Sequence, residues 1–104
     1  MLSKFEAYTV ALELYQECEK LPMNRILRDQ LSRASLSICL NLAEGSAKPG
    51  MKEKRRFYAI AFGSCREVQA LLRILGSPEN ETKKSDRLGA MLYRLVYPRT
   101  GPGP

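Results

Sequence analysis

The sequence predicts an all-α protein, specifically an antiparallel up-down-up-down four-helix bundle. Apolar residues recur at helical spacing through four segments, and no convincing run shows the two-residue alternation of a strand. The connections between these segments are short, so consecutive helices should be antiparallel. A length of 104 residues fits one domain. We expect the bundle to occupy residues 1–97 and a flexible C-terminal tail to occupy residues 98–104.

The first helix is expected over residues 3–20. Ser3 and Glu6 have the spacing of a capping box, and Pro22 should end the helix. One apolar face should enter the core, and its members are Ala7, Val10, Ala11, Leu14, Cys18 and Leu21. A second apolar stripe lies about a third of a turn away and consists of Phe5, Tyr8, Leu12 and Tyr15.

The second helix is expected over residues 25–45, with Asn24 as its N-cap and Gly45 near its C-terminal end. Its main apolar face consists of Leu27, Leu31, Ala34, Ile38 and Leu42. A second set lies on nearly the opposite side: Leu36, Cys39, Leu40 and Ala43. A helix that is apolar on two sides needs two partners, so we expect a homo-oligomer. The candidate interface residues are Phe5, Tyr8, Leu12, Tyr15, Leu36 and Leu40.

The third helix is expected over residues 51–75, after a Pro49-Gly50 loop. Its expected core face consists of Phe57, Ala61, Ser64, Val68, Leu71, Leu72 and Leu75. Gly76 should cap its C-terminus. The fourth helix is expected over residues 78–96, with Ser77 as N-cap and Pro78 in the first turn. It should bury Leu88, Met91, Leu92 and Leu95.

The composition excludes several kinds of site. The chain has no histidine, which excludes a Ser-His-Asp triad and a His-ligated metal site. Three widely spaced cysteines without a CxxC pair favour small buried hydrophobes over metal ligands. No apolar run approaches the roughly 20 residues of a membrane span, and the start lacks a signal-peptide core. We therefore expect a cytoplasmic, non-enzymatic protein without catalytic residues, metal, cofactor or membrane association.

Positive charge is concentrated in the third helical segment. The chain carries +6 in total, and residues 48–75 hold seven cations and two acids. Basic residues at helical spacing suit the phosphate backbone of RNA or DNA. The candidate nucleic-acid-binding residues are Lys48, Lys52, Lys54, Arg55, Arg56, Arg66, Arg73, Lys83, Arg87 and Arg94. No base-reading motif is present, so binding should have low sequence specificity; an ordinary solvated face is the alternative interpretation.

A polar strip follows the edge of the core face of the second helix and continues on the third. Its members are Arg33, Ser37, Asn41, Glu44, Ser64 and Glu67. We interpret the strip as a structural hydrogen-bonded network that fixes helix register, for instance through Arg33 and either Glu44 or Glu67. A ligand or active site is the alternative interpretation.

Two stretches of the sequence resemble the signatures of a known family. Residues 31–38 and 41–45 resemble its QLxRAxxSIxxNxAEG pattern, and Phe57, Ala61, Gly63-Ser64 and Glu67 resemble its FxxxAxGSxxE segment. The family comprises bacterial four-helix-bundle proteins encoded in intervening sequences of large-subunit ribosomal RNA genes. It is similar in fold to the accessory variability proteins of diversity-generating retroelements.

This resemblance implies a homopentamer with no cofactor. The retroelement relatives are basic, bind nucleic acid and associate with a reverse transcriptase. The expected function is therefore that of a homo-oligomeric accessory protein that binds RNA or DNA, with a reverse transcriptase as a possible partner. The alternative is a protein–protein scaffold with no nucleic-acid role, in which Tyr8, Leu12, Tyr15, Leu36 and Leu40 carry the interaction.

Overall fold

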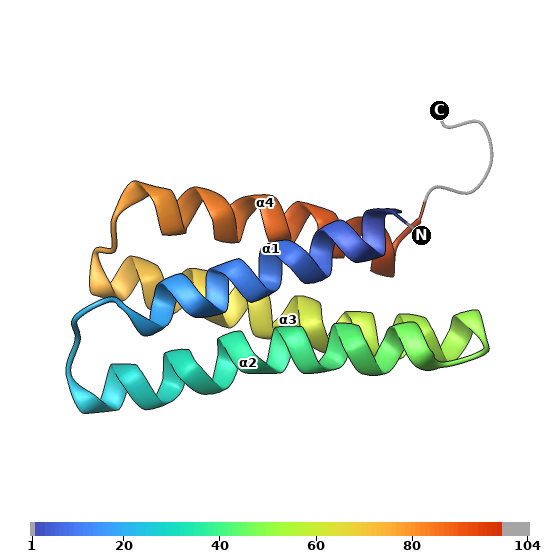
Figure 1. Ribbon diagram of the computed structural model, residues 1–104, viewed down its shortest axis with the longest axis horizontal. Helices are drawn as coiled ribbons and strands as arrows, with labels where there is room; N and C mark the ends of the chain where they lie inside the picture. The colour runs from blue at the N-terminus through green and yellow to red at the C-terminus, as the bar shows by residue number, and fades with distance from the viewer. Residues whose placement is uncertain (1, 99–104) are drawn as a thin grey trace.

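The computed structural model describes the backbone of residues 2–98 and the side chains of residues 6–98. This part of the chain contains four helices and no strand: α1 (Leu2–Glu19), α2 (Arg25–Ala47), α3 (Met51–Leu75) and α4 (Glu79–Val96). Consecutive helices run in opposite directions along one long axis (Figure 1). The predicted four-helix bundle is confirmed. The predicted tail at 98–104 lies outside the described residues, apart from Pro98.

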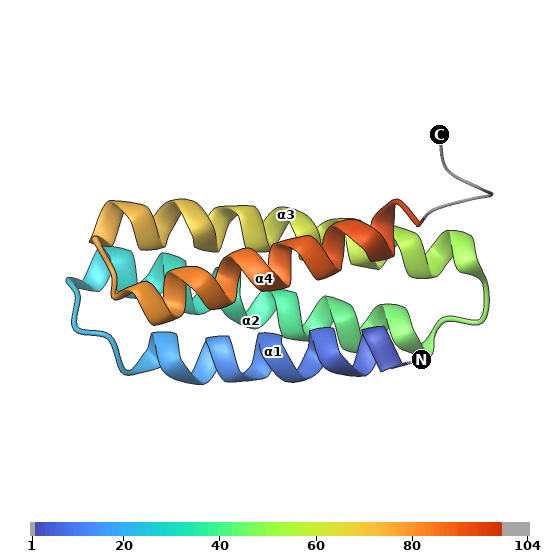
Figure 2. The same ribbon diagram turned by 90° about the horizontal axis from the view of Figure 1, so that it is seen from above.

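Each helix packs against the next one in chain order, and α4 packs against α1, so every helix contacts two others. Seen from above, α1 and α3 form the two edges of the bundle (Figure 2). The second and third helices along the chain, α2 and α3, have 23 and 25 residues, against 18 for α1 and for α4. Their connection therefore projects past the ends of α1 and α4 (Figure 1).

The core largely follows the predicted helical faces. Nearly the whole predicted face of α1 is buried, with Leu21 only half-buried at the loop. On α2, Cys39 joins the predicted core residues, whereas Leu27 is half-buried. On α4, Met91 and Leu95 pack at the core's edge, and Val96 is an additional buried residue.

The predicted core face of α3 was wrong by one residue at two positions. Tyr58 and Cys65 are buried, whereas Phe57 and Ser64 are half-buried. Leu71 and Leu75 are also half-buried. The buried series at 58, 61, 65, 68 and 72 keeps the spacing of a single helical stripe. Because apolar residues stand on both sides of this stripe, their pattern alone does not locate its centre.

Gly45 explains how Tyr58 enters the core. We predicted Gly45 near the end of α2, but the helix continues to Ala47 and Gly45 is buried within it. A Cβ at Gly45 would lie 2.8 Å from Cε1 of Tyr58 and 3.0 Å from Cβ of Phe57. The glycine is therefore needed for close approach of α2 and α3.

The helix boundaries show which capping predictions were right. The side-chain oxygen of Asn24 accepts a hydrogen bond from the Leu27 amide at 2.9 Å, as expected of an N-cap. Gly76 ends α3 with a φ of 68°, as expected of a C-cap. Two helix starts were wrong. Ser3 lies inside α1, and Pro78, with extended backbone, replaces Ser77 as the N-cap residue of α4.

Candidate nucleic-acid interface

The exposed surface of α3 carries a stripe of cations. Lys52, Arg55, Arg66 and Arg73 are all exposed. None of them forms an ion pair with an acidic residue in the described part of the chain. From Lys52 to Arg73 the stripe covers about 31 Å at ~1.5 Å per residue. It is a long surface of uncompensated positive charge.

The projecting connection between α2 and α3 adds cations held by local contacts. Lys48 pairs with Glu44 at 3.1 Å, and its ammonium lies 5.2 Å from the centre of the Phe57 ring. The Arg56 guanidinium lies 5.3 Å from the same ring. The Lys54 ammonium donates to the Ser46 carbonyl at 3.0 Å. Half-buried Phe57 thus holds two cations at this end of the bundle.

The fourth helix is less basic than the third. Lys83 pairs with Glu79 at 3.3 Å on an exposed surface. Arg87 and Arg94 are exposed and have no ion pair among the described residues. Of the three cations predicted here to bind nucleic acid, Lys83 is therefore paired with an acid, whereas Arg87 and Arg94 are not.

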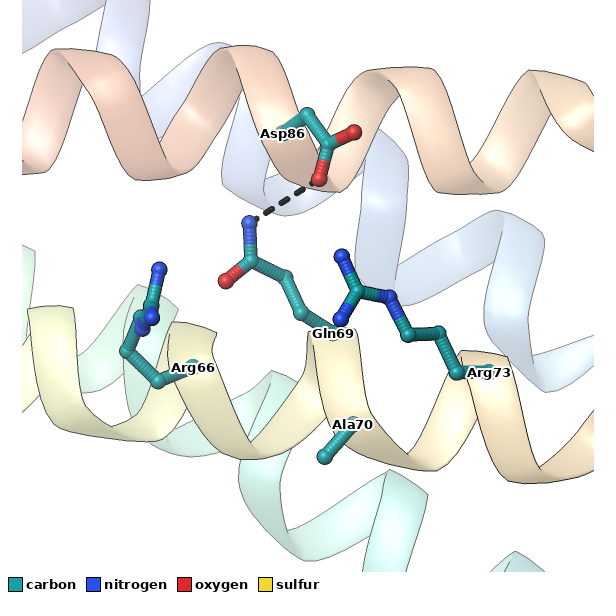
Figure 3. A pocket seen from close by; sticks show the side chains of 5 residues that line it. All are labelled: Arg66, Gln69, Ala70, Arg73 and Asp86. Carbon is teal, nitrogen blue, oxygen red and sulfur yellow. Dashed lines mark hydrogen bonds between the residues drawn. The ribbon is translucent and has the colours of Figure 1, made fainter.

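Two cations of α3 meet α4 across a shallow cavity of about 410 Å³. Arg66 and Arg73 line it on either side of Gln69, and all three side chains extend toward α4 (Figure 3). The Gln69 amide donates to the carboxylate of Asp86 at 3.0 Å. Sequence reasoning missed Gln69 and Asp86, because neither belongs to a basic or apolar pattern.

The polar strip joins α2 to α3 through side-chain contacts. Arg33 donates to the carboxylate of Glu67, one of its two expected partners. The hydroxyls of Ser37 and Ser64 lie 2.8 Å apart, and the Asn41 amide donates to the Ser37 carbonyl at 2.9 Å. The Arg33 and Glu67 side chains are 57% and 39% exposed, so this ion pair faces solvent.

Glu44 does not join that strip, since its recorded ion-pair partner is Lys48. The strip therefore runs from the Arg33–Glu67 pair through Ser37 and Ser64 to Asn41. Its contacts between two helices fit a structural role.

The structure contains an ion cluster between α1 and α4 that was not predicted from the sequence. The Lys84 ammonium donates to Glu17 at 2.6 Å and to Glu13 at 3.3 Å. The Lys84 side chain is only 18% exposed, and its hydrogen bond to Glu17 raises its pKa above the usual value. Lys84 and Glu17 are 67 positions apart, so no local pattern indicates the contact.

An aromatic series beside the basic stripe was also missed. The Phe62 ring on α3 packs edge-on against Tyr93 on α4, with centroids 6.0 Å apart. Tyr93 and Tyr97 follow with centroids 4.9 Å apart. The spacing of four residues between the two tyrosines is the available sequence signal, because such residues share one helix face.

The predicted oligomer interface is an exposed apolar surface on α1 and α2. Tyr8, Leu12, Leu36 and Leu40 are 40%, 38%, 41% and 59% exposed. Tyr15 is half-buried against the core, and the Phe5 side chain lies outside the described residues. The helices α1 and α2 pack against each other, so these side chains lie on neighbouring elements. We call Tyr8, Leu12, Leu36 and Leu40 the apolar surface.

The cysteines are buried, as predicted. Burial raises the pKa of Cys18 and of Cys65 to about 12, and that of Cys39 to about 11. The thiols are therefore protonated and unreactive near neutral pH. Within the described residues, no group of three or more His, Cys, Asp or Glu side chains is placed to hold a metal ion.

The fold and the surface together define a small basic four-helix bundle. The sequence matches the family model of the 23S rRNA-intervening sequence protein over residues 4–93. The chain therefore belongs to the 23S rRNA-intervening sequence protein family, which confirms the resemblance seen in its motifs. A search of curated proteins found no significant match. Among the described helices, none has the length and apolar character needed to cross a membrane.

Proposed function

We propose that this protein is a non-enzymatic accessory protein that binds RNA or DNA through the basic residues of α3 and α4. The observation that carries the proposal is the α3 stripe of Lys52, Arg55, Arg66 and Arg73, which is exposed and without acidic partners in the described structure. Each phosphate that such a surface neutralises releases counterions, which favours binding.

The proposed binding has low sequence specificity. Cations spread along a helix surface contact phosphates, and phosphate contacts carry no direct sequence information. Arg66 and Arg73 can fork onto phosphate oxygens, which strengthens the contact without reading a base.

The proposal includes a homo-oligomer assembled through the apolar surface on α1 and α2. Because those residues lie on helices other than α3, association through them would leave the cations of the stripe accessible. A pentamer, the state implied by the family resemblance, would multiply the +6 charge of one chain fivefold and add weak contacts through avidity. Light-scattering mass on a sizing column tests the subunit number, and a monomer would contradict it.

A reverse transcriptase is the protein partner included in this proposal, because the resembling retroelement proteins associate with one. Co-purification of the two proteins in the presence of nuclease tests a direct contact. Loss of the partner after nuclease treatment would contradict such a contact and leave nucleic acid as the bridge.

The central experiment reverses two charges of the stripe, with Arg55→Glu and Arg66→Glu in one chain. We expect at least about tenfold weaker binding to a short RNA at low salt, and a salt slope that is less steep by about 2. A control with the same charge change, Lys20→Glu and Arg25→Glu, lies near the α1–α2 connection and should lose less affinity. Unchanged affinity and slope in the α3 variant would contradict the proposal.

A protein–protein scaffold is the second candidate, and the exposed apolar surface supports it. Large apolar side chains on neighbouring helices are suited to a protein contact. In this case the protein would not bind RNA or DNA even at low salt. Leu36→Gln with Leu40→Gln would remove binding of the protein partner while leaving the α3 stripe intact.

A further inference from the structure

Exposed aromatic rings extend along α4 next to the basic stripe of α3. Tyr93 and Tyr97 are 53% and 60% exposed, although tyrosine rings usually bury most of their area. The Tyr93 ring contacts both Phe62 and Tyr97. These contacts hold the rings in place while leaving much of their area open to solvent.

Two arginines, Arg66 and Arg73, follow Phe62 along α3. The Arg66 guanidinium lies 6.0 Å from the centre of the Phe62 ring and also lines the cavity between α3 and α4. Arg73 lies on the other side of Gln69 in the same cavity (Figure 3). We call the surface formed by Tyr93, Tyr97, Phe62, Arg66 and Arg73 the aromatic–arginine groove; the cavity lies at its arginine end.

The groove combines the two kinds of side chain that bind an unpaired nucleic-acid strand. Aromatic rings occupy one end and arginines the other, over about 16 Å between Phe62 and Arg73 at ~1.5 Å per residue. Proteins that hold single strands combine stacking rings for the bases with a positively charged path for the backbone. Bases in a duplex are already stacked on one another and do not offer free faces to such rings.

We propose that the aromatic–arginine groove binds single-stranded nucleic acid. Bases stack on Tyr93 and Tyr97, and phosphates lie between Arg66 and Arg73. This inference rests on the proposed nucleic-acid function and specifies the form of its ligand. Asp86 at the cavity edge weakens phosphate binding by repulsion, while its hydrogen bond orients Gln69.

The first test compares ligands on the unaltered protein. Fluorescence anisotropy measures binding of labelled oligouridylate and oligodeoxythymidylate of about twelve nucleotides, and of blunt duplexes of the same length. We expect the single strands to bind about tenfold more tightly than the duplexes, the scale of one stacking contact. Equal or tighter duplex binding would overturn this inference alone, whereas binding of neither form would overturn the proposed function as well.

The second test substitutes the two tyrosines. Tyr93→Leu with Tyr97→Leu should weaken single-strand binding about tenfold and leave duplex binding nearly unchanged. Tyr93→Phe with Tyr97→Phe keeps both rings and should retain the affinity. Equal losses in the Leu and Phe variants would overturn stacking. A light-scattering mass that changes in the Leu variant would instead assign the tyrosines to a subunit contact and would also overturn it.

A third measurement does not depend on the Leu variant being folded. The chain has five tyrosines and no tryptophan, so its ultraviolet emission reports on tyrosine alone. Oligodeoxythymidylate should quench this emission, and the quenching should largely disappear in the Tyr93→Phe, Tyr97→Phe variant while the affinity remains. Equal quenching in both proteins would contradict base contact with these rings.

The last variant tests the phosphate end of the groove. Asp86→Asn removes a negative charge but keeps an oxygen that can accept the Gln69 hydrogen bond. Single-strand affinity should rise about two- to fivefold, since a nearby like charge repels phosphate. An unchanged or lower affinity would place the phosphates elsewhere and overturn this part of the assignment.

Discussion

Different forces hold the α2–α3 pair and the α1–α4 pair together. Between α2 and α3 the closest fit is steric, because Gly45 leaves space for the ring of Tyr58, and the polar strip adds the exposed Arg33–Glu67 ion pair. Between α1 and α4 the contact includes a charge cluster, in which Lys84 binds Glu13 and Glu17. A side-chain amide of Asn80 also donates to Glu17 at 3.2 Å.

The difference explains where the free positive charge lies. Acids of α1 are used in contacts within the bundle: Glu13 and Glu17 bind Lys84, and Glu19 pairs with Arg28 at 3.5 Å. The ion pair described between α2 and α3 takes its cation, Arg33, from α2, so it neutralises no cation of α3. The ion pairs that stabilise one side of the bundle thereby leave a basic surface on the other.

The largest expected effect comes from filling the space at Gly45. Gly45→Val should lower the free energy of unfolding by about 3 kcal/mol, because its Cβ would clash with Tyr58 and Phe57. Urea unfolding measures the change. In the control Gly63→Ala the new Cβ meets nothing within 4 Å, so stability should rise by up to about 1 kcal/mol. If both variants changed stability alike, the steric account of the α2–α3 contact would be wrong.

Alkaline pH should weaken the bundle through its buried thiols. Thiols of the unfolded chain have a pKa near 9.0, whereas burial raises the pKa of Cys18 and of Cys65 to about 12. The native state therefore holds more protons in this window, and stability falls as pH rises, by at most about 1.4 kcal/mol per pH unit for each thiol. Urea unfolding in a reducing buffer should show a shallower decline for Cys65→Ala. An identical decline would exclude the thiol as a contributor.

The charge cluster between α1 and α4 predicts a smaller and salt-dependent effect. Lys84→Met should lower stability by about 1–2 kcal/mol at low salt, because Glu13 and Glu17 would then repel each other without a cation. The neighbouring Lys83→Met is the control, since the Lys83 side chain is 73% exposed and should contribute at most about 0.5 kcal/mol. Thermal unfolding at two salt concentrations measures both, and equal effects would contradict the assignment.

The same lysine gives the α1–α4 contact its own pH dependence. The pKa of Lys84 is raised by its hydrogen bond to Glu17, so its stabilising effect is complete below the unfolded value of 10.5 and is lost as pH rises through the folded pKa. Lys84→Met should therefore flatten the alkaline decline. If stability declined with pH as steeply in this variant as in the unaltered protein, the cluster would not depend on the charge of Lys84.

The smallest effect is expected at the exposed Arg33–Glu67 pair. Arg33→Met should change stability by at most about 1 kcal/mol, because ion pairs that face solvent contribute little. A double-mutant cycle with Glu67→Gln isolates the coupling between the two side chains. A coupling well above 1 kcal/mol would mean that this contact, and not only steric fit, holds α2 to α3.

Much of the fold could be predicted because it depends on local pattern. The periodic faces of α1 and α2, the Asn24 cap and the Gly76 stop are each visible within one turn or two of the chain. The face of α3 was harder, because Phe57 and Tyr58 are adjacent aromatics and the choice between them depends on Gly45 in another helix. Contacts of that kind require the packing of two elements.

The candidate nucleic-acid interface could likewise be predicted only in part. Exposure of the α3 cations follows from helical spacing, so those positions could be predicted. Which cations remain free depends on distant acids, as Lys84 and Glu17 illustrate, and the aromatic–arginine groove arises only where α3 and α4 meet. The sequence indicates which residues can bind a polyanion, whereas the structure indicates which of them remain free of acidic partners.

The projecting end of the α2–α3 pair has a consequence for local stability. From Ser46 to Phe57 no residue is buried, and five residues of this segment are cations. Amide protons there should exchange with solvent through local opening, long before those of the central turns. We therefore expect the end of the hairpin to open while the rest of the bundle stays intact, which would let it adapt its shape to a ligand.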